Sequence, residues 1–177
     1  MYFSLAAALL AASSAQASTF EPVSLRQLTT TATAIVRVNI VETTAQWNAG
    51  HDYIETLATV EVTDVLGGDL ADGEILTVRE VGGEVDGYHV SAVGFPKLEA
   101  GADLVVFLTT WPQDGSYRVH EFAYGIYEVV TAPSGQTVLM PGPTQDTPGA
   151  TMFNPEAPVA PKTPLATLAR SVAQLRR

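Results

Sequence analysis

The sequence predicts an all-β domain, either a barrel or a sandwich, with one short helix before it and one after it. Between residues 34 and 140, short segments alternate apolar and polar residues, as strands with one buried face do. Turn sequences containing glycine separate these segments, and they also bound the strongest apolar run, Leu104–Leu108. Short strands at such close spacing are typical of barrels and sandwiches.

Residues 1–17 have the pattern of a secretory signal peptide. An apolar run from Leu5 to Ala12 precedes Ala15-Gln16-Ala17, a small-residue sequence of the kind that signal peptidase cleaves. The run is far shorter than the ~20 residues that span a bilayer, so no stable membrane anchor is expected. No Lys or Arg precedes the run, although signal peptides usually have a positive charge there. The alternative interpretation of residues 1–17 is an N-terminal helix packed on the domain. We expect an exported protein, periplasmic or extracellular, that begins at Ser18.

Composition limits the classes of function. The chain has 177 residues, a formal net charge of -10 and no cysteine. Without residues 1–17, about 160 residues remain, which is enough for one domain with a substantial core. The lack of cysteine excludes disulfides, thiol catalysis and zinc–thiolate sites. The acidic balance argues against nucleic acid and anionic lipid as partners, because both are bound mainly through Lys and Arg.

The domain is expected to begin with a short helix. Residues 24–27 fit a capping box, with Ser24 at the N-cap and Gln27 three residues later, and the helix runs toward Ala32. Because Leu104–Leu108 is apolar on both faces, it predicts the central and most buried strand. The alternating segments predict the other strands, at residues 34–41, 57–64, 74–81, 88–93, 117–122, 124–130 and 137–140.

The composition changes at Pro141. Seven prolines lie between residues 141 and 164, and each removes an amide donor and restricts φ, so residues 141–162 predict an extended tether. Thr163 and Pro164 then fit an N-cap and a first helical position. The helix at 163–177 has one apolar stripe, and we expect it to dock on its own barrel because an isolated helix of this length is marginal in water. The predicted organisation is a signal peptide at 1–17, a β-barrel domain at 18–140, the tether at 141–162 and a C-terminal helix at 163–177.

No set of residues has the spacing of a catalytic, cofactor or metal site. The three imidazoles are far apart and match no local metal signature, the acidic groups lack the spacing of a calcium loop, and no Gly-x-Ser-x-Gly motif occurs. The residues weighed in this way are His51, His89, His120, the group Asp69, Asp72 and Glu74, and the group Glu80, Glu84 and Asp86. Gly82-Gly83 does not precede a helix, as a phosphate-binding loop would. We therefore predict no catalytic residue, no cofactor and no metal ion.

Aromatic residues are the remaining candidates for a binding surface. Most of them are expected to fill the core, and Tyr117 and Tyr127 are the two whose exposure would indicate a binding platform. The full set is Trp47, Tyr53, Trp111, Tyr117, Phe122, Tyr124 and Tyr127.

Several segments together resemble a family of exported bacterial proteins of unknown function. They are Ala34-Ile-Val-Arg-Val-Asn-Ile-Val41, Thr59-Val-Glu-Val-Thr-Asp-Val-Leu-Gly67, Gly82-Gly83, Gly94-Phe-Pro96 and Gly101-Ala-Asp-Leu-Val-Val-Phe-Leu108. More distantly, their order is similar to the barrel of the tissue inhibitors of metalloproteinases, which carries IVR-x-x-V, E-V-x-x-V-x-x-G and G-x-x-Y-L strands in this order. The resemblance covers about residues 20–130 and implies a five-stranded OB-type Greek-key barrel.

The resemblance also implies a kind of partner, an exported metalloprotease. In the inhibitor family, the mature N-terminal amine and first carbonyl chelate the catalytic zinc, and the second side chain enters the specificity pocket. The matching positions here are Ser18 and Thr19, followed by Phe20. The family's first residue is a disulfide-bonded cysteine, and Ser18 lacks that tether.

Two functions remain open from the sequence. The first is a non-enzymatic protein-binding module, of the metalloprotease-inhibitor kind if the resemblance extends to mechanism. The second is a hydrolase or small-ligand carrier whose site assembles from distant residues. A deep pocket lined by a His and carboxylates would favour the second, and a flat barrel with an ordered, protruding N-terminus would favour the first.

Overall fold

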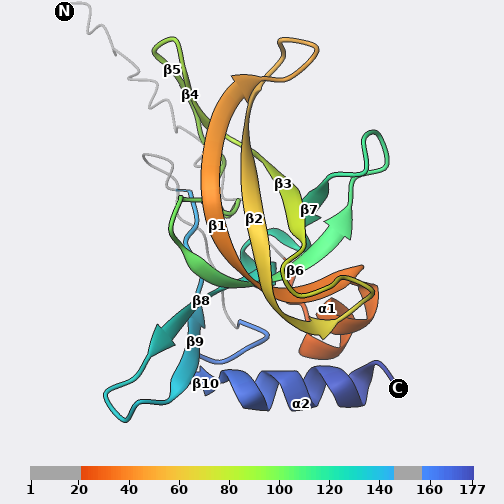
Figure 1. Ribbon diagram of the computed structural model, residues 1–177. Coiled ribbons are helices and arrows are strands. Elements are labelled where there is room, and N and C mark those ends of the chain that lie inside the picture. The colour runs from red at the N-terminus through yellow and green to blue at the C-terminus, as the bar shows by residue number, and fades with distance from the viewer. Residues whose placement is uncertain (1–20, 146–156) are drawn as a thin grey trace, which may run out of the picture.

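The structure is a computed structural model that describes residues 21–145 and 157–177, and it contains a closed five-stranded barrel (Figure 1). In order around the barrel, the strands are β1 (Ala34–Trp47), β2 (Ile54–Gly67), β3 (Ile75–Val81), β7 (Tyr117–Val119) and β6 (Asp103–Thr110). Pairing of β6 with β1 closes the ring, and all neighbours are antiparallel except β3 and β7. The predicted all-β, OB-type barrel with two flanking helices is confirmed.

The other elements extend or cover the barrel. They are α1 (Leu25–Thr31), the small hairpin of β4 (Gly83–Val85) and β5 (Tyr88–Val90), the 3₁₀ helix η1 (Phe122–Gly125), the strands β8 (Ile126–Thr131), β9 (Thr137–Pro141) and β10 (Thr163–Pro164), and α2 (Leu165–Leu175). Strands β8, β9 and β10 continue the sheet beyond β6, while α1 and α2 lie together below the barrel in the view of Figure 1.

Strand β6 supplies side chains to two separate hydrophobic cores. Successive side chains of a strand point to opposite faces. Leu104, Val106 and Leu108 therefore fill the barrel, whereas Val105 and Phe107 pack outside it with residues of α1 and α2. All five are at most 2% exposed, so the prediction that this is the central, most buried run is confirmed.

Helix α2 docks on its own domain, as its apolar stripe predicted. Leu168 and Val172 are buried in the outer core. Arg176 fastens the end of α2 to the end of α1, since its guanidinium donates hydrogen bonds to the carbonyls of Thr29 (3.2 Å) and Ala32 (2.5 Å). A cation is favourable here because the last carbonyls of a helix carry partial negative charge.

The helix boundaries agree with the sequence at one end of the domain and differ at the other. The hydroxyl of Ser24 accepts the Gln27 N–H at 3.1 Å, as the capping box predicted. At α2, Pro164 is the N-cap instead of the first helical residue. Thr163 and Pro164 pair with β9, and the Thr163 hydroxyl donates to the carbonyl of Ala160 instead of capping the helix.

Several strand boundaries also differ from the prediction. The β1–β2 hairpin continues to Trp47 and Ile54, well past the predicted ends. The strand predicted at 117–122 ends at Val119, because Glu121 and Phe122 adopt φ values of 56° and 52°, which a strand cannot contain.

Candidate functional site

A cleft of about 390 Å³ opens at one end of the barrel, where the β1–β2 hairpin rises beyond the other strands. Its volume lies within the usual ~300–1,000 Å³ of ligand pockets. Leu98 belongs both to the cleft lining and to the barrel core, so the cleft continues the barrel interior toward solvent. The lining consists of Thr43, Ala45, Thr56, Gly82, Gly83, His89, Val90, Ser91, Pro96, Lys97, Leu98, Thr144 and Gln145.

A β-bulge at Val41 directs β1 side chains into this cleft. The pairing of β1 with β2 steps from Ile40↔Val60 to Glu42↔Thr59, which leaves Val41 as an extra residue. An extra residue exchanges the two faces of the strand beyond it. Even-numbered residues up to Ile40 face the barrel core, whereas beyond the bulge Thr43 and Ala45 line the cleft.

Gly82 and Gly83 form a side-chain-free wall where the chain leaves β3. Their φ values are 110° and 137°, a conformation that favours glycine. A Cβ on Gly83 would lie 2.9 Å from the Ala45 Cβ and 2.9 Å from the Thr56 hydroxyl oxygen. Glycine at this position therefore lets β4 pack directly against the inner face of the β1–β2 hairpin.

The side chain of Gln145 holds two walls of the cleft together. Its oxygen accepts the Ala92 N–H at 3.1 Å, and its nitrogen donates to the carbonyls of Val81 (2.5 Å) and Pro96 (3.0 Å). Its main-chain N–H donates to the Phe95 carbonyl at 2.8 Å. A side-chain amide suits this position because it combines an acceptor with two donors.

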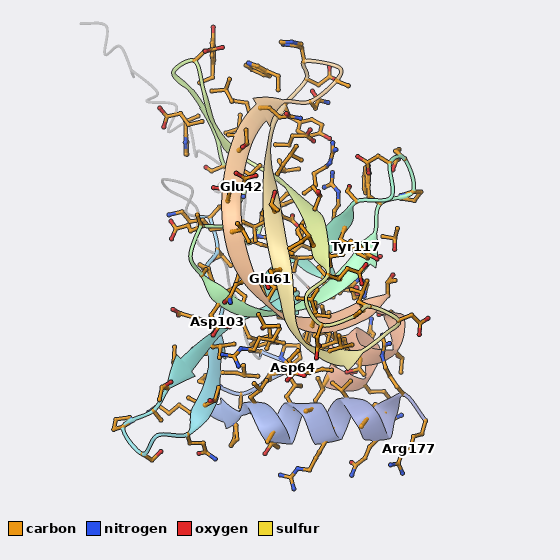
Figure 2. All side chains as sticks on the ribbon, in the orientation of Figure 1. Glu42, Glu61, Asp64, Asp103, Tyr117 and Arg177 are labelled. Atoms are coloured by element: carbon orange, nitrogen blue, oxygen red, sulfur yellow. The ribbon has the colours of Figure 1, made fainter. Side chains whose placement is uncertain are left out.

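Among the described residues that line the cleft there is no carboxylate, although the chain is strongly acidic. Its ionisable side chains are His89 and Lys97, and the Lys97 ammonium pairs at 2.7 Å with Glu99, which lies outside the lining. Acidic side chains on β1 and β2 such as Glu42 and Glu61 are exposed and lie outside the lining too (Figure 2). The cleft therefore favours an uncharged or anionic ligand over a cation.

Aromatic side chains join the tips of the two hairpins above the cleft. The Trp47 ring stacks on His51, with centroids 5.5 Å apart, and meets Tyr88 edge-on at 5.7 Å. Tyr88 is 63% exposed, which makes it the most exposed large hydrophobic residue in the described part of the chain. These contacts tie the β4–β5 hairpin to the β1–β2 hairpin at the rim.

A second cleft, of about 370 Å³, lies beside β3 and the loop between β6 and β7. Its lining includes the Arg79 guanidinium, which bonds both oxygens of the buried Glu55 at 2.9 Å and one oxygen of Asp114 at 2.5 Å. Because the Arg79 guanidinium bonds two carboxylates of the protein, Arg79 serves the fold, and the first cleft is the better candidate site.

Among the described residues, Thr31 and His120 are the pair that most resembles a catalytic nucleophile and its general base. His120 Nε2 lies 2.6 Å from the Thr31 hydroxyl, which itself donates to the Gln27 carbonyl at 2.7 Å. Nε2 must then carry the proton, so it cannot act as a base toward Thr31. Glu121 approaches the same nitrogen, at 3.9 Å, whereas a catalytic triad needs its acid on the other ring nitrogen. Burial lowers the pKa of His120.

The structure separates the residues that the sequence singled out. His51, His89 and His120 lie in three different places, and within the described ranges no three His, Asp or Glu side chains gather as a metal site. Tyr127, whose exposure would have indicated a binding platform, is 1% exposed and belongs to the outer core, so it forms no such platform. Tyr117 is partly buried against the barrel core. Ser18, Thr19 and Phe20, the partner-binding residues implied by the inhibitor resemblance, lie outside the described residues.

Comparison of the chain with protein-family models, with curated proteins and with solved structures gave no match. In the described part of the chain, none of the helices has the length and apolar character to span a bilayer.

Proposed function

We propose that this protein is an exported, non-enzymatic binding module whose binding site is the cleft at the end of the barrel. The observation that carries the proposal is the cleft itself, with its ligand-sized volume and its mixture of apolar side chains, hydroxyls and main-chain groups. Export is supported by the signal-peptide pattern of residues 1–17.

Binding is favoured over catalysis by the way the polar groups of the cleft are used. The Gln145 amide is bonded to three main-chain groups and the Lys97 ammonium to Glu99, so both are held in place by the protein. The lining also contains hydroxyl groups, at Thr43 and Thr144 among others, and the hydroxyl of Thr56 donates to the Gly82 carbonyl at 2.7 Å. Such fixed, converging groups orient a ligand without activating a reacting atom.

The proposal is tested with two variants of neighbouring residues on β1. Thr43→Trp fills the cleft, whereas Thr44→Trp places the same side chain on the exposed, opposite face. A library of small-molecule fragments and short peptides is screened by ligand-observed NMR against the full chain and both variants. Ligands should bind the wild type and Thr44→Trp but not Thr43→Trp. If no compound distinguishes Thr43→Trp from the wild type, the cleft is not the binding site.

A further inference from the structure

We propose that the cleft receives an extended segment of a partner polypeptide, which pairs as an added strand with the free edge of β1 at Thr43 and Ala45. The inference rests on the proposed function and specifies the class of ligand. Addition of a strand to a sheet edge supplies main-chain hydrogen bonds for affinity and leaves side-chain contacts for specificity.

The upper half of β1 has a partner on one edge alone. Strand β2 pairs with β1 along its whole length as far as Trp47, but β6 pairs with it only from Ala34 to Asn39. The next residue, Ile40, still bonds to the loop before β6, and beyond it no described strand pairs with that edge. Figure 1 shows β1 and β2 rising together past the point where β6 crosses.

The free main-chain groups of this edge belong to the residues that line the cleft. Successive residues of a strand direct their N–H and C=O groups to opposite edges. The main-chain N–H of Asn48 donates across the hairpin to the Tyr53 carbonyl at 2.9 Å. Thr44 lies four residues earlier, so its main-chain groups also point toward β2. Thr43 and Ala45 then direct their main-chain groups to the other edge, and both line the cleft.

The β4–β5 hairpin approaches β1 without covering this edge. It forms a two-stranded sheet of its own and has no ladder with β1. Gly83 meets β1 and β2 through the side chains of Ala45, Thr56 and Ile54, which is contact with the face of the hairpin. Among the described residues, none pairs with the edge beside Thr43 and Ala45, which therefore remains open to the cleft.

The chemistry of the lining indicates the kind of segment that fits. Because the described lining has no carboxylate and its Lys97 ammonium is already paired with Glu99, the cleft suits a segment with neutral side chains. A basic segment would find no carboxylate in the described lining to pair with and is disfavoured.

The test begins with a displayed library of random linear octapeptides selected against the full-length chain. A selected peptide is then synthesised in two N-methylated forms, which carry methyl groups on alternate amides in opposite phase. Only one phase removes the N–H groups that face β1. We expect that form to bind at least about tenfold more weakly and the other form to bind within about twofold of the parent.

Matched variants locate the peptide on the protein. Ala45→Pro removes an N–H at the free edge, a position where strands tolerate proline, and should weaken peptide binding by about tenfold or more. Amide NMR signals of Thr43 and Ala45 should shift on titration with the parent peptide. If Ala45→Pro does not fold, the two N-methylated peptides still decide the question with the wild-type protein.

The outcomes separate this inference from the proposed function. Equal weakening by both methylation phases, or none by either, would show that main-chain pairing is not used and overturn the inference. Small-molecule fragments that bind in the cleft when no peptide is enriched would also overturn it and leave the proposed function standing. Failure of both fragments and peptides to bind would overturn both.

Discussion

The buried carboxylate of Glu80 accepts the main-chain N–H of Val119 at 2.7 Å. It thereby joins β3 to β7, two parallel strands that share a single bridge, Val78↔Tyr117, at this seam of the barrel. Burial is the larger influence on this group and raises the pKa of Glu80 to about 7, while the hydrogen bond from Val119 and the charge of Arg118 act in the opposite direction. The seam therefore depends on a group that titrates near neutral pH.

Glu80→Gln should reduce the pH dependence of stability. A carboxyl whose pKa is raised in the folded state stabilises the fold below its unfolded pKa, and this contribution is lost as the pH rises through 7. Urea unfolding should show that the free energy of unfolding of the wild type falls between pH 5 and pH 8 by about 2–3 kcal/mol more than that of Glu80→Gln. Glu84→Gln, at an exposed position of β4, serves as the control. Parallel pH profiles for wild type and Glu80→Gln would contradict the assignment.

Phe107→Ala should remove about 3–5 kcal/mol of the free energy of unfolding, because Phe107 is fully buried between the sheet and the two helices. Ile75→Ala, at a residue that is 58% exposed, should change it by less than about 1 kcal/mol. Denaturant unfolding of both variants measures the contrast. A small effect at Phe107 would mean that the outer core does not stabilise the domain.

Arg176→Ala should loosen the contact between the two helices. It removes two charge-assisted hydrogen bonds to the carbonyls of Thr29 and Ala32, and a loss of about 1–3 kcal/mol is expected. Hydrogen exchange of the α1 amides should also become faster. The neighbouring Arg177→Ala, at an exposed residue, should leave both measurements unchanged. Equal effects of the two variants would show that the positive charge at the end of α2, and not the two hydrogen bonds of Arg176, stabilises the contact.

The mature protein recovered from its native host should begin at Ser18, because the Ala15-Gln16-Ala17 sequence fits signal peptidase. Mass analysis of the intact chain gives the answer directly. An unprocessed Met1 on protein from the soluble cytosol would rule out export.

Periodicity was enough to predict the strands of the barrel, because each of them buries one face or both. Leu104–Leu108 could be identified as the central strand since apolar residues on both faces require two cores. The burial of Tyr127 could not be decided from the sequence, because alternation shows which residues share a face but not what covers that face. Its outward side is covered by Val159 and α2, far along the chain.

The cleft could not be predicted from the sequence for a related reason. The bulge at Val41 exchanges the two faces of β1, and no change in residue type marks it, since polar and small residues occupy both faces beyond that point. Gln145 lies beyond the predicted barrel domain, so nothing indicated that it fastens the wall at Val81. Only Gly82-Gly83 carried a signal, and the sequence indicates a turn there as readily as a wall of a binding site.

The two cores on β6 also have a consequence for how the chain folds. The barrel core is built from residues 34–126, but the outer core joins Leu28 to Val172, so it cannot form until almost all of the described chain is available. Contacts between such distant segments slow folding, because loop-closure entropy must be overcome first. During synthesis, Val105 and Phe107 would face solvent until α2 arrives, and an intermediate with an exposed apolar sheet is prone to aggregate.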